Sequence, residues 1–164
     1  MKKIFGIGLA KTGTTSFSKA LDLLGYKSIH EPKTWKQIDD NEAITDIAIP
    51  FPYNELYKRY PNSIFILTTR DNENWIKSIS KQFHKNKRPK DKIERIKKFY
   101  GTYEFNPNVW LNRKIAYEKE VKSFFVDKNF IVLDLKDENK WEKLCGLLQI
   151  EIPNFEFPHL NKSL

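Results

Sequence analysis

The sequence of 164 residues lacks several features on which common classes of protein depend. It holds one cysteine, Cys145, so an internal disulfide and a cysteine-based zinc site are both excluded. The three histidines, His30, His84 and His159, lie far apart, and we expect no metal site. No apolar run approaches the ~18 residues that a membrane-spanning helix needs. The short apolar stretch near the N-terminus contains two glycines and does not resemble a signal peptide. We therefore expect a soluble, cytoplasmic protein.

The chain does contain enough apolar surface for one folded domain. Hydrophobic residues make up 40% of the sequence and aromatic residues 14%. A chain of this length buries roughly 70% of its unfolded surface around a single core. No internal repeat, linker or low-complexity segment divides it. We expect a single domain over residues 1–164.

The net charge of +8 is concentrated in one segment of the chain. Residues 81–98 contain nine lysine or arginine residues and two acidic ones, so the rest of the sequence is close to neutral. Such a basic run is typical of a solvated helix face, or of a site for an anionic ligand or acceptor. No RNP-type, KH-type or helix-turn-helix signature accompanies it, and a dedicated nucleic-acid-binding function is not expected.

Apolar runs of strand length alternate with segments of helical periodicity, which predicts a parallel sheet with crossover helices. We expect strands at 3–8, 26–30, 44–49, 63–69 and 130–135, and helices at 14–24, 54–60, 71–83, 109–125 and 141–148. The strand at 63–69 is the strongest, because a continuous apolar run is typical of a central parallel strand. The predicted fold class is α/β, with three layers in which helices flank the sheet.

A glycine-rich segment, GLAKTGTTS, joins the first expected strand to the first helix. A loop at this place gathers backbone N–H groups and the positive end of a helix, which together attract anions. Gly8 and Gly13 have the spacing of the nucleotide-binding P-loop, GxxxxGK[ST]. The lysine position holds Thr14 instead, and Lys11 lies three residues earlier. Because an NTPase or kinase needs that lysine on the β- and γ-phosphates, its absence argues against NTP hydrolysis.

Two further anion-binding side chains follow the strongest strand. Arg70 comes directly after it, and Ser78 lies eight residues later on the next expected helix. A guanidinium at the carboxyl end of a parallel strand lies where ligands bind in open α/β sheets. It can hold a phosphate through two parallel hydrogen bonds. The alternatives are an ion pair of Arg70 with Asp71 or Glu73, and an exposed position for Ser78.

The segment from Lys11 to Ser16, KTGTTS, resembles the 5′-phosphosulfate loop of the P-loop sulfotransferases. These enzymes use 3′-phosphoadenosine 5′-phosphosulfate (PAPS) as donor, and their arginine and serine for its 3′-phosphate are spaced like Arg70 and Ser78. The resemblance is to the short single-domain branch and also covers Gly8–Tyr26, Asp46, Tyr60–Pro61, Leu67–Ser78, Trp141–Leu148 and Phe157–Asn161. Residues 81–103 fall outside it, and the second glycine-rich loop of the cytosolic members, RxGxxGxWK, is missing.

The resemblance implies transfer of a sulfuryl group from PAPS to an acceptor hydroxyl or amine, which leaves adenosine 3′,5′-bisphosphate. It assigns donor binding to Lys11, Thr12, Gly13, Thr14, Thr15, Ser16, Arg70 and Ser78. Lys11 would also act catalytically, as the cation on the leaving phosphate oxygen. No metal is required. The acceptor would be a small molecule, glycan or peptide, anionic if the basic segment contacts it.

The catalytic base that takes the acceptor's proton has three candidates. Asp46 ends a short strand-like stretch, residues 43–46, and lies where the resemblance puts a carboxylate near the acceptor. His30 and Glu31 end the preceding expected strand, and other branches of the family use a histidine or a glutamate. Asp134 ends a strand that is similar to a Walker B strand, but without the Walker lysine we expect it to be structural.

Two other functions remain open on the sequence alone. One is a small-molecule kinase with a degenerate P-loop, which Asp134 favours and Thr14 opposes. The other is a non-catalytic module that binds a nucleotide or polyanion through Lys11, Arg70 and the basic segment.

Overall fold

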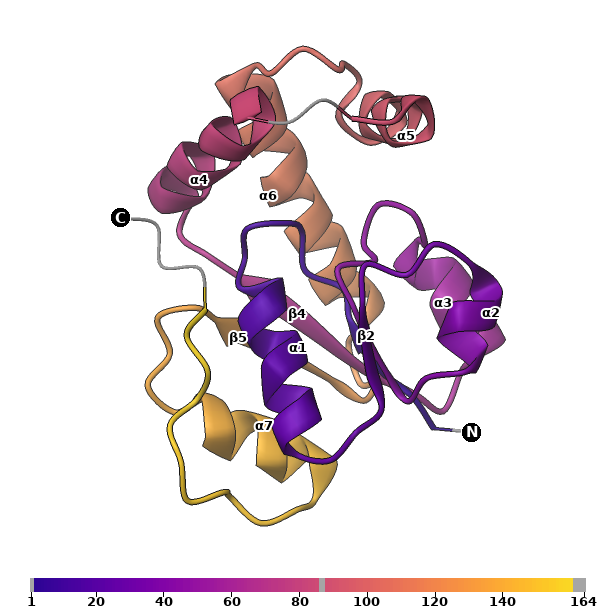
Figure 1. The fold of residues 1–164 in the computed structure, drawn as a ribbon, viewed down its shortest axis with the longest axis vertical. Helices are drawn as coiled ribbons and strands as arrows, with labels where there is room; N and C mark the ends of the chain where they lie inside the picture. Colours follow the sequence, from indigo (N-terminus) through magenta and orange to yellow (C-terminus); the bar gives the residue numbers. More distant parts are fainter. Residues whose placement is uncertain (1, 86–87, 161–164) are drawn as a thin grey trace.

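The structure, a computed structural model, describes residues 2–85 and 88–160. Within that part of the chain five strands form one sheet, in which every neighbouring pair is parallel (Figure 1). They are β1 (Ile4–Gly6), β2 (Ser28–His30), β3 (Ala43–Thr45), β4 (Ile64–Thr69) and β5 (Phe130–Asp134). Their order across the sheet is β2-β3-β1-β4-β5. The α/β class with a parallel sheet is therefore confirmed.

Seven helices connect and cover the strands in the described residues. They are α1 (Thr14–Leu23), α2 (Trp35–Asp39), α3 (Tyr53–Arg59), α4 (Asn72–Lys85), α5 (Lys90–Tyr100), α6 (Pro107–Phe124) and α7 (Lys140–Leu148). The sequence did not predict α2 or α5. α2 begins at a capping box between Thr34 and Gln37, and α5 takes up the second half of the basic run. No helix in residues 2–85 or 88–160 is long and apolar enough to cross a membrane.

The two faces of the sheet bury different side chains, because neighbouring residues of a strand point to opposite faces. Phe5 and Phe65 pack in a cluster with residues of α3 and α6, whereas Ile4 and Ile64 pack against α1 and α7. Cys145 of α7 belongs to the second cluster and is fully buried. Helices thus cover both faces, which gives the expected three layers (Figure 1).

The strand expected at 44–49 is wrong in its second half. β3 ends at Thr45, and Asp46 then takes a left-handed conformation with φ of 57°. Ile47 and Ala48 remain buried, although they no longer belong to a strand. The apolar run therefore reflects burial in the core, and the sharp turn at Asp46 interrupts the extended backbone.

The carboxyl ends of the strands meet at the edge of the sheet above which α4 and α5 lie (Figure 1). From β1 the chain passes to β2 and β3 on one side, and it later crosses to β4 on the other side of β1. Ligands of open α/β sheets bind outside the carboxyl ends at such a change of direction. This is where the β1–α1 loop, residues 7–13, is located.

Candidate functional site

Two glycines allow the β1–α1 loop to fold against the end of β4. A Cβ atom on Gly8 would overlap the hydroxyl of Thr68 and lie 2.6 Å from its carbonyl oxygen. Gly13 has φ of 92° and caps α1 without a side-chain hydrogen bond. No side chain of the cap residue binds the first N–H groups of α1, and these groups and the helix dipole favour an anion there.

Thr12 stabilises the loop from within. Its hydroxyl lies 2.7 Å from the carbonyl oxygen of Leu9, to which it donates a hydrogen bond, and 2.7 Å from the hydroxyl of Thr68 on β4. The side chain is almost fully buried. The hydroxyl of Thr12 is thus engaged inside the protein, which gives it a role in shaping the loop.

Two helices, α4 and α6, also bind the backbone of the loop through side-chain hydrogen bonds. The indole N–H of Trp75 on α4 donates to the carbonyl oxygen of Ala10 at 2.9 Å. The hydroxyl of Tyr117 on α6 donates to the carbonyl oxygen of Ile7 at 2.7 Å. Both side chains are buried, so these bonds fix the loop immediately before Lys11.

Lys11 lies between this anchored backbone and Arg70. It has φ of 70°, a left-handed conformation that is uncommon for a residue with a side chain. The guanidinium of Arg70 reaches the carbonyl oxygen of Lys11 at 3.5 Å. The expected alternative pairing does not occur among the described residues, because Asp71 pairs with Lys136 and Glu73 with Lys77.

A cavity of about 80 Å³ joins the loop, the end of β4 and α4. Its lining consists of Lys11, Gly13, Thr14, Thr15, Ser16, Arg70, Ser78, Leu135, His159 and Leu160. All the residues that the sequence assigned to donor binding, apart from Thr12, therefore face one space. Two of them, Arg70 and Lys11, are 59 positions apart in the chain.

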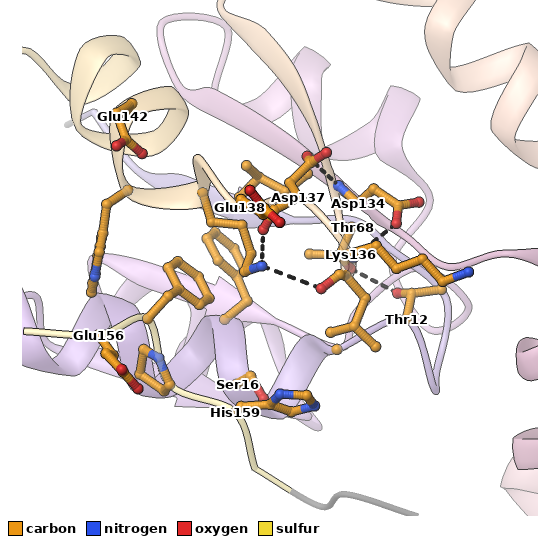
Figure 2. Close-up of a pocket in the computed structure, with 18 of the residues that line it drawn as sticks. Thr12, Ser16, Thr68, Asp134, Lys136, Asp137, Glu138, Glu142, Glu156 and His159 are labelled. Atoms are coloured by element: carbon orange, nitrogen blue, oxygen red, sulfur yellow. Dashed lines mark hydrogen bonds between the residues drawn. The ribbon is translucent and has the colours of Figure 1, made fainter.

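A second cavity, of about 440 Å³, shares Gly13, Ser16, Leu135 and His159 with the first (Figure 2). Its lining includes the aromatic rings of Phe17, Trp141 and Phe157 and five carboxylates, Asp134, Asp137, Glu138, Glu142 and Glu156. The backbone N–H of Leu160 donates to the hydroxyl of Ser16 at 2.9 Å, which joins the C-terminal segment to α1. The two adjoining cavities together offer more volume than a single phosphate group would fill.

Both carboxylate oxygens of Asp134 are engaged in hydrogen bonds within the protein. It accepts hydrogen bonds at 2.9 Å from the hydroxyl of Thr69 and from the backbone N–H of Lys136. These bonds tie the end of β5 to the end of β4.

The three candidate bases lie together at the carboxyl ends of β2 and β3. The Nε2 atom of His30 is 3.8 Å from Oδ2 of Asp46, and its Nδ1 atom is 2.9 Å from the hydroxyl of Thr45. Burial raises the pKa of the Asp46 carboxyl, an effect that His30 partly offsets. Glu31 differs: burial alone would raise its pKa, but hydrogen bonds from Lys92 and Lys33 lower it to about 2.

Asp46 lines a cavity of about 80 Å³ that also includes Ala10, the residue before Lys11. The candidate base and the candidate donor site therefore adjoin at two consecutive residues of the β1–α1 loop. No group of three metal-ligating side chains occurs in residues 2–85 and 88–160.

Comparison with known proteins agrees with this geometry. A family model described as the sulfotransferase domain matches residues 3–38 and 31–164, which is most of the chain. The chain belongs to the sulfotransferase family. No curated protein matches it. Among solved structures, a sulfotransferase from Alicyclobacillus acidocaldarius has a TM-score of 0.64 and 13% sequence identity, covering 100% of this chain and 86% of that chain. This likeness concerns the fold.

The structure adds residues to the candidate site that the sequence did not single out for it. His159 lines both of the adjoining cavities, those of about 80 Å³ and 440 Å³. Trp75 binds the loop backbone, and Lys92 pairs with a candidate base. Their distance from the loop in the sequence leaves no local signal for these contacts. Lys87 of the basic run and Asn161 of the C-terminal segment lie outside the described residues.

Proposed function

We propose that this sulfotransferase moves a sulfuryl group from PAPS to an acceptor hydroxyl or amine, and releases adenosine 3′,5′-bisphosphate. The observation that carries the proposal is the convergence of Lys11, Arg70 and Ser78 on one cavity at the start of α1. A donor with phosphate groups at both its 5′ and 3′ positions needs two separate cationic sites within one nucleotide's length. The loop and the end of β4 supply them.

In this proposal the 5′-phosphosulfate lies in the β1–α1 loop and the 3′-phosphate lies on Arg70 and Ser78. The guanidinium of Arg70 supplies charged, paired hydrogen bonds, and the Ser78 hydroxyl adds a donor. The base of the nucleotide extends into the adjoining 440 Å³ cavity, where Trp141 and Phe157 offer aromatic surface. Carboxylates in that cavity can accept hydrogen bonds from an exocyclic amine.

The transfer step requires the protein to remove the acceptor proton, to stabilise the leaving oxygen and to stabilise the sulfuryl oxygens. The acceptor oxygen attacks sulfur, the bond from sulfur to the 5′-phosphate oxygen breaks, and the acceptor proton passes to a base. Lys11 stabilises the charge that grows on the leaving oxygen, and the N–H and hydroxyl groups of residues 13–16 stabilise the sulfuryl oxygens. Binding and electrostatics at the loop then favour the transition state over the bound donor.

We assign the base to Asp46, with His30 as its neighbour. Burial raises the pKa of the Asp46 carboxyl, which makes it a stronger base in its ionised form. His30 is held through Thr45, and its ring lies 3.8 Å from Asp46, near enough for a charge interaction but too far for a hydrogen bond. Glu31 is less suited, because two lysines hold its carboxylate and lower its pKa to about 2.

Thermal unfolding with added ligands separates this function from the two alternatives. Adenosine 3′,5′-bisphosphate without Mg²⁺ should stabilise the protein by about 2.7 kcal/mol at a hundredfold excess over its Kd. Stabilisation by ATP only with Mg²⁺ would instead indicate a kinase, and stabilisation by heparin alone a polyanion-binding module. Transfer of label from radiolabelled PAPS to an acceptor then tests the reaction itself, and its absence with every acceptor class would contradict the proposal.

A further inference from the structure

The basic run contributes one face of α5 to the acceptor side of the site. Lys92, Arg95 and Lys98 recur every third residue, which places them on one side of the helix. Lys92 and Arg95 line the small cavity next to Asp46, and Arg95 and Lys98 line a larger cavity beside it. Four other basic residues of the run with described side chains, Lys81, Arg88, Lys90 and Lys97, line neither space.

The larger cavity has a volume of about 420 Å³ and lies between the Pro50–Tyr53 segment, α5 and α6. It shares Ala48, Ile49, Pro50 and Arg95 with the small cavity, so the two adjoin. Its walls are mainly apolar or aromatic and include Ile49, Pro52, Tyr53, Phe99 and Tyr117. A space of this size and lining suits a small organic molecule with a flat apolar body.

Cations outnumber carboxylates in the lining of this larger cavity. The lining contains three cations, Arg95, Lys98 and Arg113, and one carboxylate, Glu55. Arg95 and Arg113 have ion-pair partners, Asp91 and Glu120, but neither partner lines the cavity.

Two of these cations are placed to meet a ligand. Lys98 has no carboxylate partner within residues 2–85 and 88–160. Arg113 lies 4.5 Å over the ring of Phe99 and donates to the carbonyl oxygen of Phe99 at 3.2 Å. Its charge is thereby fixed against the aromatic wall.

We propose that this cavity binds the acceptor, and that the acceptor carries a carboxylate, sulfate or phosphate group on a flat apolar body. Its anionic group would lie near Lys98 and Arg113, and its hydroxyl would point through the small cavity to Asp46. The inference rests on the proposed sulfotransfer function, since it names the substrate class of the same site. A neutral acceptor of equal shape would displace water from these cations without forming ion pairs with them. That loss of hydration disfavours its binding.

Matched acceptors test the charge requirement. The probes are para-hydroxyphenylacetate and its methyl ester, which share the phenol and the ring and differ in charge. With radiolabelled PAPS, kcat/KM should be about tenfold higher for the acid, and this preference should fall as salt is added. Equal or higher kcat/KM for the ester overturns the inference and leaves the sulfotransfer function intact.

Two lysines of α5 provide a matched pair of variants. Lys98→Glu should reduce the preference for the acid by about tenfold, because it replaces an attractive charge with a repulsive one in the cavity. Lys97→Glu changes the net charge equally, but Lys97 is exposed and does not line the cavity, so the preference should persist. If both variants lower the preference equally, the general field of the basic run is responsible and the site is refuted.

A binding measurement separates failure of this inference from failure of the proposed function. Calorimetry first tests adenosine 3′,5′-bisphosphate, and then each probe added to that complex. If the bisphosphate binds, tighter binding of the acid than of the ester supports the inference even where turnover is slow. If neither probe binds, or both bind equally, the acceptor class is wrong. If the bisphosphate does not bind, the proposed function fails with it.

Discussion

At the scale of the residue, backbone conformation places three of the candidate functional side chains. Lys11, Glu31 and Asp46 all have φ between 57° and 70°, and each follows the carboxyl end of a strand in the parallel sheet. A left-handed conformation outside glycine is unfavourable by about 1 kcal/mol or more and persists where the surrounding structure fixes it. At these positions the three side chains line two cavities above the sheet that adjoin at the β1–α1 loop.

Replacing Asp46 by Asn tests the assignment of the base. The amide keeps the volume and cannot accept the proton, so kcat should fall by about 10²- to 10⁴-fold while bisphosphate affinity stays unchanged. In the parent enzyme activity should fall with decreasing pH through a pKa above the ordinary 3.8, because burial raises the pKa of Asp46 and the acid form is inactive. The kcat–pH profile of both proteins measures this.

His30→Gln and Glu31→Gln are the controls for Asp46. Glu31→Gln should retain turnover, since its carboxylate is held by two lysines. Full activity of Asp46→Asn with loss of activity in His30→Gln would transfer the base to the histidine. If all three variants remain active, the acceptor ionises without a protein base.

Replacing Arg70 by Ala tests the position of the donor's 3′-phosphate. Loss of a charged hydrogen bond costs about 1.5–3 kcal/mol, which is roughly a 10- to 150-fold change in Kd. Calorimetry should show this loss for adenosine 3′,5′-bisphosphate and little change for AMP, which lacks the 3′-phosphate. If the parent protein bound the two nucleotides with equal affinity, the assignment of the 3′-phosphate to Arg70 would be wrong.

At the scale of the element, helices remote in sequence hold the β1–α1 loop in shape. α4 contributes the indole of Trp75 and α6 the hydroxyl of Tyr117, each to a loop carbonyl oxygen. The position of Lys11 therefore depends on how α4 and α6 pack on the sheet. A loop fixed in this way loses little conformational entropy when it binds an anion.

Trp75→Phe tests whether α4 positions the loop. The variant keeps an aromatic ring and removes the hydrogen bond to Ala10, and a bond of this kind contributes about 1 kcal/mol. We expect kcat to fall by tenfold or more with a smaller change in bisphosphate affinity, because Lys11 acts mainly on the transition state. Steady-state kinetics and calorimetry together measure that difference.

Trp110→Phe is the matched control for Trp75→Phe. The indole N–H of Trp110 is buried and has no hydrogen-bond partner in the described part of the chain, so its loss breaks no such bond. This variant should keep its kcat even if its melting temperature changes. A similar fall of kcat in both variants would show a general effect of core packing rather than control of the loop.

At the scale of the whole molecule, ion pairs connect the basic segment to the sheet. Glu31 at the end of β2 pairs with Lys92 of α5 at 2.7 Å and with Lys33 at 2.9 Å. The buried side chains of Ile96 and Tyr100 hold the same helix on its apolar side. Together they place α5 as a wall of the two cavities beside Asp46.

The Glu31 ion pairs should make stability depend on pH. Its pKa of about 2 in the folded protein lies below the ordinary 4.5. The stabilisation is therefore fully present above pH 4.5 and is lost as the pH falls from 4.5 toward 2. Because Glu31 is more than one-third exposed, we expect Glu31→Gln to lower the free energy of unfolding by no more than about 1 kcal/mol at pH 7.

Urea unfolding at several pH values measures this stabilisation. The difference between the parent and Glu31→Gln should shrink steadily below pH 4.5, and Lys92→Gln should lose part of the same stabilisation. Lys36→Gln is the control, since Lys36 pairs with Asp40 at the exposed end of α2 and does not contact Glu31. A difference that stays constant down to pH 2 would exclude the ion pairs as its source.

The sequence by itself determined the fold class, and it singled out most of the residues that line the cavity at the β1–α1 loop. Apolar runs report burial and periodicity reports local structure, so strands such as β4 and helices such as α6 are predictable. The loop at Gly8–Ser16 is likewise local, because its glycines and small polar residues are consecutive. Arg70 and Ser78 could be placed because a strand end and a helix turn fix their spacing.

Only the tertiary structure decided which residues surround Asp46. The sequence did not predict α5, because its many charged residues leave only Ile96 and Tyr100 as buried positions in a short helix. The turn at Asp46 could not be predicted from the sequence, because a buried turn and a strand have the same apolar composition. The pairing of Glu31 with Lys92 joins residues 61 positions apart, and such a contact forms only when the chain has packed. Local physics sets the elements, whereas long-range packing determines which side chains share a cavity.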